Sequence, residues 1–220
     1  MTSCYFRILI LFLLPFSVTA QIDDFLVQPS LNISSTLSSR WGFNTTIAQR
    51  SLVYENTEAL HIQGAQFATY EIGFYSQLGV GVMYRELFDH QRPEELRTTQ
   101  QYVHKRKYNA FKIAHRGRWD QRWRGNRLTH RWRYRLSGSI PFNGLKTDAA
   151  EFYLTGNVET LFIAENKKQP MYDQRFSLGL GRQISRKIKL QLLAQYRIED
   201  FTMSSQRLLF VNLGLYYSLR

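Results

Sequence analysis

Seven arginines at alternating positions of two neighbouring segments are the residues best placed to do chemistry in this chain. They are Arg116, Arg118, Arg122, Arg124, Arg131, Arg133 and Arg135. Side chains two positions apart on a β-strand share one face of the sheet, so paired strands would carry a basic ladder. Guanidinium groups bind carboxylates and phosphates through paired hydrogen bonds. The spacing therefore predicts a ladder that binds anions or pairs with acidic side chains.

The net charge of the 220-residue chain is concentrated around this ladder. The formal charge is +12, yet residues 104–135 hold twelve Lys and Arg and a single acid, Asp120. The rest of the chain after residue 20 carries equal numbers of basic and acidic residues. The basic character therefore belongs to one predicted hairpin and not to the surface as a whole.

Acidic side chains on the same predicted faces offer partners for the ladder. They are Asp120, Glu151, Glu159 and Asp173, with Glu199 on a later segment. The preferred hypothesis is an Arg–carboxylate network that fills a narrow interior. The other is a ladder that binds or passes small anions, phosphate or acidic glycans among them.

Patterns typical of enzymes are sparse. The five histidines lack metal-ligand spacing such as H-E-x-x-H, and there is no G-x-S-x-G nucleophile turn. Asp89 and His90 are adjacent in a polar loop and could act as a general base. We therefore expect a non-enzymatic protein with no cofactor, no metal and no catalytic residue. The alternative is a barrel hydrolase that acts at its rim.

The first twenty residues predict export. Arg7 is followed by the apolar stretch 8–16 and by Val18-Thr19-Ala20, a typical signal-peptide cleavage site. Cys4 is the one cysteine, so cleavage would leave a chain without disulfides. Residues 21–37 are expected to be a polar periplasmic lead-in, and residues 38–220 the folded domain. Export and the expected burial of the arginines argue against nucleic acid as a partner.

Apolar residues alternate with polar ones along most of the chain, which is typical of strands with one apolar face. Phe67 and His115 break the alternation. The pattern predicts an antiparallel up-and-down β-barrel of about ten strands, with twelve strands as an alternative. The expected strands are 38–50, 58–74, 77–88, 99–107, 110–124, 128–142, 149–163, 171–184, 187–200 and 205–219.

Alternation alone does not tell whether the apolar face points inward or outward. A soluble β-sandwich that binds acidic ligands is therefore an alternative. Strand length, aromatic residues near strand ends, and short turns at one rim with longer loops at the other favour a membrane barrel. An even number of strands would place both chain ends at the short-turn rim. We expect an outer-membrane protein whose partners are membrane lipid and the barrel-assembly machinery.

Two segments carry a resemblance to a known family. The stretches His115–Arg122 and Arg131–Leu136, followed by Ser139-Ile140-Pro141-Phe142, resemble the domain-of-unknown-function family number 2490. Asn157-Val158-Glu159 and Asp173-Gln174-Arg175 fit its downstream pattern. The resemblance implies a predicted outer-membrane β-barrel of Gram-negative bacteria, and it implies no activity.

Overall fold

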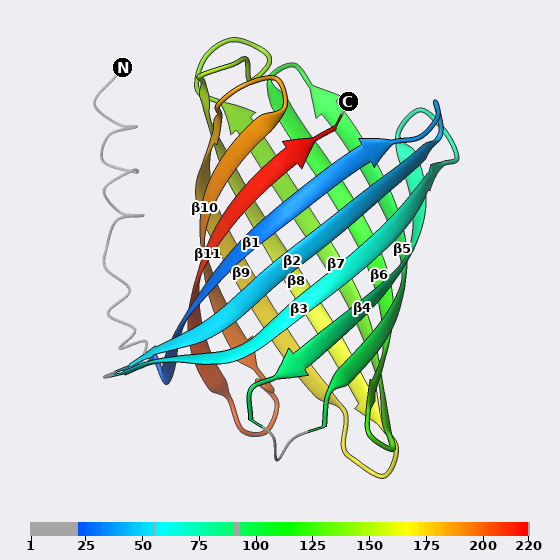
Figure 1. Ribbon diagram of the computed structural model, residues 1–220, viewed down its shortest axis with the longest axis vertical. Coiled ribbons are helices and arrows are strands. Elements are labelled where there is room, and N and C mark those ends of the chain that lie inside the picture. Colours follow the sequence, from blue (N-terminus) through cyan, green and yellow to red (C-terminus); the bar gives the residue numbers. More distant parts are fainter. Residues whose placement is uncertain (1–21, 55, 90–92, 220) are drawn as a thin grey trace, which may run out of the picture.

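The computed structural model describes residues 22–54, 56–89 and 93–219. Eleven strands close into one barrel, in which each strand pairs with its neighbours in sequence and β11 returns to β1 (Figure 1). The strands are β1 (Asp24–Thr36), β2 (Trp41–Tyr54), β3 (Asn56–Glu71), β4 (Ser76–Leu87), β5 (Glu95–Tyr108), β6 (Phe111–Arg124), β7 (Arg127–Pro141), β8 (Phe152–Glu165), β9 (Met171–Gln183), β10 (Ile188–Glu199) and β11 (Gln206–Ser218).

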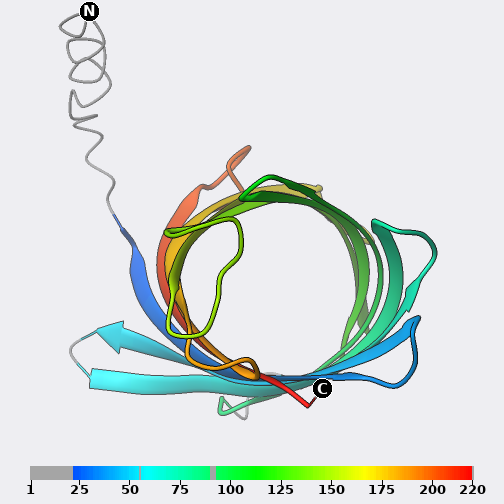
Figure 2. The same cartoon turned by 90° about the horizontal axis from the view of Figure 1, so that it is seen from above.

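The predicted closed all-β barrel is confirmed, with one strand more than the expected ten. The β-sandwich and the twelve-strand alternative do not agree with this topology. Seen from above, the wall is a ring from which the hairpin β2–β3 projects (Figure 2). Within the described residues, no helix is long and apolar enough to cross a membrane.

The additional strand is β1, which lies within the segment expected to be a lead-in. Val27, Leu31 and Ile33 alternate with polar residues, but Pro29 falls in the middle of this short pattern, and Leu26 breaks it toward the start of the strand. Proline lacks a backbone donor and argues against an interior strand. Gln28 and Pro29 indeed have no paired residue on β2, although the register is the same on both sides of this gap, while β1 keeps continuous parallel pairing with β11.

The parallel β1–β11 pair puts the two ends of the described chain at opposite rims of the barrel. Because eleven is odd, β1 begins at the lower rim of Figure 1 and β11 ends at the upper rim. The expectation that both ends share a rim is therefore wrong. The turn asymmetry is also weaker than expected, because the longest connection, 142–151, is at the upper rim, beside the two-residue turn 109–110.

The apolar face of the barrel points outward and the charged face points inward. Exposed side chains on the wall include Val80, Leu178 and Leu192, at 59%, 61% and 53% of their full area. Buried groups include arginines, glutamates and aspartates from β4 to β10. A small apolar cluster of Leu26, Leu208 and Phe210 lies at the β1–β11 seam. The interior is therefore mainly an ionic core.

Local packing explains the two residues that break the alternation. Phe67 faces inward because Gly81 opposite it has no side chain, and a Cβ there would lie 2.5 Å from the ring. The guanidinium of Arg118 stacks on this ring at 5.0 Å. His115 faces outward, and its Nδ1 shares a 2.7 Å hydrogen bond with the Tyr134 hydroxyl.

Candidate functional site: an arginine-lined interior

The barrel encloses a cavity of about 1080 Å³. The residues lining it come from both halves of the barrel, from Asn32 and Tyr216 near the upper rim to Asp200 and Gln206 near the lower rim. The cationic residues lining it are Arg50, Arg85, Arg97, Lys105, Arg116, Arg118, Arg122, Arg124, Arg131, Arg133, Arg135, Arg175 and Arg197. All seven arginines of the predicted ladder are therefore among them.

The pairing of β6 with β7 brings like charges together. Arg116 is directly opposite Arg135, and Arg118 is directly opposite Arg133. Like charges at directly opposed positions of an antiparallel pair repel each other and destabilise the sheet. These two strands therefore need carboxylates from elsewhere in the barrel.

Glu95, the first residue of β5, is the carboxylate with the most arginine partners. It is completely buried. Its Oε2 accepts hydrogen bonds from Arg122 Nη2 at 2.6 Å and from Arg124 Nε at 2.6 Å. Arg97 bonds its Oε1, and Arg85 Nη1 lies 3.6 Å from Oε2. One negative charge thus holds four arginines from three strands.

Asp120 and Glu159 neutralise the middle of the ladder, and both are completely buried. Asp120 accepts bonds from Arg133 at Oδ2 and from the Thr99 hydroxyl at Oδ1, the latter at 2.7 Å. Glu159 Oε1 accepts bonds from Arg116 Nη2 at 3.2 Å and from Arg135 Nε at 3.1 Å. The repulsion between opposed arginines is thereby offset by carboxylates.

Arg175 on β9 links the ladder to the far side of the barrel. Its Nη2 donates to Asp173 Oδ2 at 3.2 Å, and its Nη1 lies 3.7 Å from Glu159 Oε2. Glu199 is more open, and its Oε1 is 3.8 Å from Arg175 and 3.9 Å from Arg197. Asp120, Glu159 and Asp173 are thus brought to the arginines, as the sequence predicts.

Glu151 is the predicted partner that the structure does not bring to the ladder. It precedes β8, and its Oε2 accepts a 2.8 Å hydrogen bond from the backbone N–H of Asp148. The expected strand began at residue 149, whereas the connection 142–151 continues to the residue before Phe152. The placement of Glu151 as an interior partner is therefore wrong, because the side chain serves its own loop.

Several interior residues lie outside the predicted ladder. Arg85, Arg175 and Arg197 follow the period-two pattern of their own strands and could be found by extending the ladder around the barrel. Glu95 was harder to recognise because it follows Pro93 in a polar stretch. The alternation of Glu95, Arg97 and Thr99 is the feature of the sequence that indicates an inward-facing Glu95.

The candidate rim site rests on Asp89 and His90. Asp89 lies in the connection between β4 and β5, and His90 lies outside the described residues. Among the residues that the structure describes, no three His, Cys, Asp or Glu side chains form a group that could hold a metal ion.

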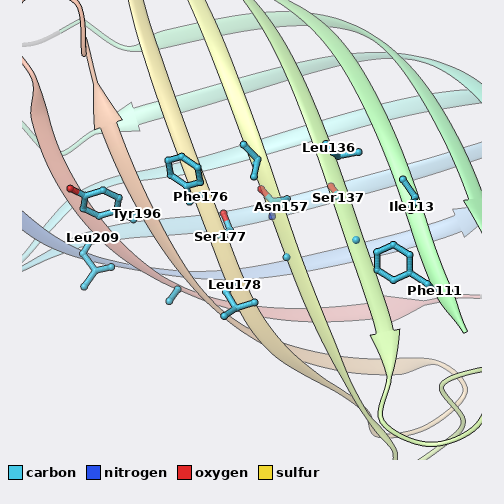
Figure 3. Close-up of a pocket in the computed structure, with 14 residues that line it drawn as sticks. Phe111, Ile113, Leu136, Ser137, Asn157, Phe176, Ser177, Leu178, Tyr196 and Leu209 are labelled. Carbon is cyan, nitrogen blue, oxygen red and sulfur yellow. The ribbon is translucent and has the colours of Figure 1, made fainter. Parts of the chain in front are cut away.

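A second hollow, of about 630 Å³, lies on the outer wall and is lined mainly by apolar residues. Phe111, Leu136, Phe176 and Leu178 surround it (Figure 3). Two glycines, Gly138 and Gly156, pair directly across β7 and β8 and leave this part of the outer wall without side chains. This groove has no charged lining, so the charged chemistry belongs to the interior.

A comparison with models of known families identifies the family of this chain. The model of a family described as "Protein of unknown function (DUF2490)" matches residues 29–207, from within β1 to the start of β11. No curated protein matches the chain. The match covers both segments of the arginine ladder and the strands that carry Glu95, Glu159 and Asp173. The chain belongs to the DUF2490 family.

Proposed function

We propose that the protein is an integral outer-membrane β-barrel that acts as a narrow, anion-preferring pore. The membrane part of the proposal rests on the outer wall. Large apolar side chains are exposed on nearly every strand, among them Val82, Leu136, Val158, Leu190 and Leu213. In water such a wall would be an extended apolar patch of the kind that soluble monomers rarely expose. A bilayer removes that cost, because acyl chains cover the wall.

Aromatic side chains near the rims support the same placement. Toward the lower rim, contacts with ring centroids 5.1–6.2 Å apart join Trp119, Trp132, Phe162, Tyr172 and Phe201. Toward the upper rim, Trp41 and Tyr70 pack at 4.9 Å, and exposed aromatics include Tyr75, Tyr108, Phe142 and Phe152. Outer-membrane barrels carry two such girdles, one at each membrane interface.

The charge of the interior carries the functional part of the proposal. Thirteen cationic side chains line the cavity, against Glu165, Asp173, Glu199 and Asp200. Glu95, Asp120 and Glu159 lie buried behind the arginines. Thirteen cations against seven acids leave an excess of six positive charges. In a passage walled by low-dielectric protein and lipid, this excess attracts anions and repels cations.

A structural barrel is the second candidate. The observation that favours it is the density of the ionic core, in which Leu161, Glu95, Glu159 and Asp120 are completely buried. A closed lattice of ion pairs would fix the shape of the barrel and block solutes. This candidate predicts the same membrane location but no conductance.

Ion selectivity in planar bilayers tests the pore. We expect channels whose reversal potential, under a KCl gradient, shifts toward the chloride equilibrium potential, with chloride severalfold more permeant than potassium. Arg182→Gln is the control for cations outside the lumen, because Arg182 is exposed on the outer face and stacks on Phe152. This variant should keep the wild-type selectivity. Cation selectivity would contradict the proposal, and a silent bilayer would leave the structural candidate.

A further inference from the structure

One buried arginine of the interior has no hydrogen-bond or ion-pair partner within the part of the chain that the structure describes. Arg131 is only 6% exposed. Its guanidinium makes no hydrogen bond or ion pair with any described residue, and its buried Nε lacks an acceptor. A buried cation is normally paired, because leaving it without a counter-charge costs several kcal/mol. Arg131 nevertheless lines the cavity.

The carboxylate directly opposite Arg131 in the sheet bonds other residues. Asp120 is its direct cross-strand neighbour. However, the two oxygens of Asp120 accept bonds from Thr99 and Arg133. On the other side of β7, Arg131 pairs in register with the apolar Ile163. Among the described residues of β6 and β8, none therefore bonds the Arg131 guanidinium.

The surroundings of Arg131 are cationic. The charged side chains with the strongest electrostatic effect on it are Arg133, Arg122, Arg97 and Arg175. Each of these four is held by a carboxylate: Glu95 for Arg97 and Arg122, Asp120 for Arg133, and Asp173 for Arg175. Arg131 therefore completes a cluster of five guanidinium groups. The buried Nε of every member lacks an acceptor, and Arg131 is the member that no carboxylate of the described residues holds.

We propose that Arg131 and this cluster form a binding site for a tetrahedral oxyanion of the phosphate class. The proposal deepens the anion preference of the pore and rests on it. A guanidinium donates two parallel N–H groups, a geometry that matches two oxygens of one phosphate. Chloride offers a single acceptor atom and therefore gains less binding energy from the two parallel N–H groups. The oxyanion supplies the counter-charge that β6, β7 and β8 do not provide at this position.

Binding of inorganic phosphate to the refolded full chain in a neutral detergent tests the site. We expect a saturable heat of binding in calorimetry and a rise of the unfolding midpoint above that in chloride of equal ionic strength. Arg131→Gln should weaken phosphate binding about ten- to hundredfold, because it removes charge-assisted hydrogen bonds. Arg182→Gln should bind as the wild type does. General stabilisation by phosphate acts on every variant alike, so the difference between variants reports the site.

The outcomes separate this site from the pore. Phosphate binding that is lost in Arg131→Gln supports the site even if the bilayer is silent, in which case only the pore fails. Anion-selective conductance without a phosphate response overturns the site and leaves the pore. Equal phosphate binding by Arg131→Gln and the wild type would also overturn it.

Discussion

Glu95→Gln is expected to lower the free energy of unfolding by about 3–5 kcal/mol, the cost typical of removing one partner from a buried ion pair. The substitution keeps the size of the side chain but removes its negative charge. Arg97, Arg122 and Arg124 bond this carboxylate, and Arg85 lies within ion-pair distance. Without it, four neighbouring cations repel one another. Urea unfolding of the refolded protein, followed by tryptophan fluorescence, measures the change.

Glu58→Gln is the control for this variant. Glu58 is exposed in β3, so its neutralisation should change the free energy of unfolding by less than about 0.5 kcal/mol. A double-mutant cycle with Arg122→Gln isolates the pairwise contribution and should give a coupling of about 0.5–3 kcal/mol. Equal stability of Glu95→Gln and Glu58→Gln would show that the ionic core does not hold the barrel together.

Leu192→Arg should cost about 2–4 kcal/mol of stability in phospholipid vesicles, because it places a cation on the proposed lipid-facing wall. Leu192 lies near the middle of β10 and is 53% exposed. An exposed leucine of a soluble protein would tolerate the same change with little effect. The expected loss therefore arises from the bilayer and not from protein packing. Unfolding of the vesicle-embedded protein by denaturant measures it.

Leu145→Arg provides the matched comparison. Leu145 is 61% exposed but lies in the connection 142–151 at the upper rim, where the added charge remains in water. We expect wild-type stability for this variant. Loss of stability confined to Leu192→Arg supports the membrane-facing wall, whereas two equally stable variants would mean that the wall meets water.

Period-two alternation, which is a local property, predicted the strands of the closed barrel and put the arginines on one face. Strand length and the aromatic residues near strand ends then predicted that this face points inward. The pattern did not predict β1, because Pro29 interrupts the pairing of this strand with β2. The strand is kept in place by its pairing with β11, which is far away in the sequence: Ser30 and Leu213, which share a hydrogen bond, are 183 residues apart. Long-range pairing of this kind leaves no local signal. The strand number and the rim at which the chain ends depend on that one closure.

The partners within the interior were predicted only in part for the same reason. Glu159 and Asp173 lie on regular strands, so their faces followed from the pattern. Which arginine each carboxylate meets depends on the register and on side chains from three or four strands. The alternation that puts Arg131 on the same face as Arg133 and Arg135 therefore could not show that no described residue would pair with it.

Quenching of tryptophan fluorescence by brominated acyl chains tests the central claim, that the apolar wall faces lipid and the arginines face inward. Trp41, Trp119 and Trp132 are 39–45% exposed on the outer wall, and Trp123 shares their face. The protein refolded into brominated vesicles should lose most of the fluorescence that it shows in unbrominated vesicles of the same chain length. Equal fluorescence in the two kinds of vesicle would contradict the account.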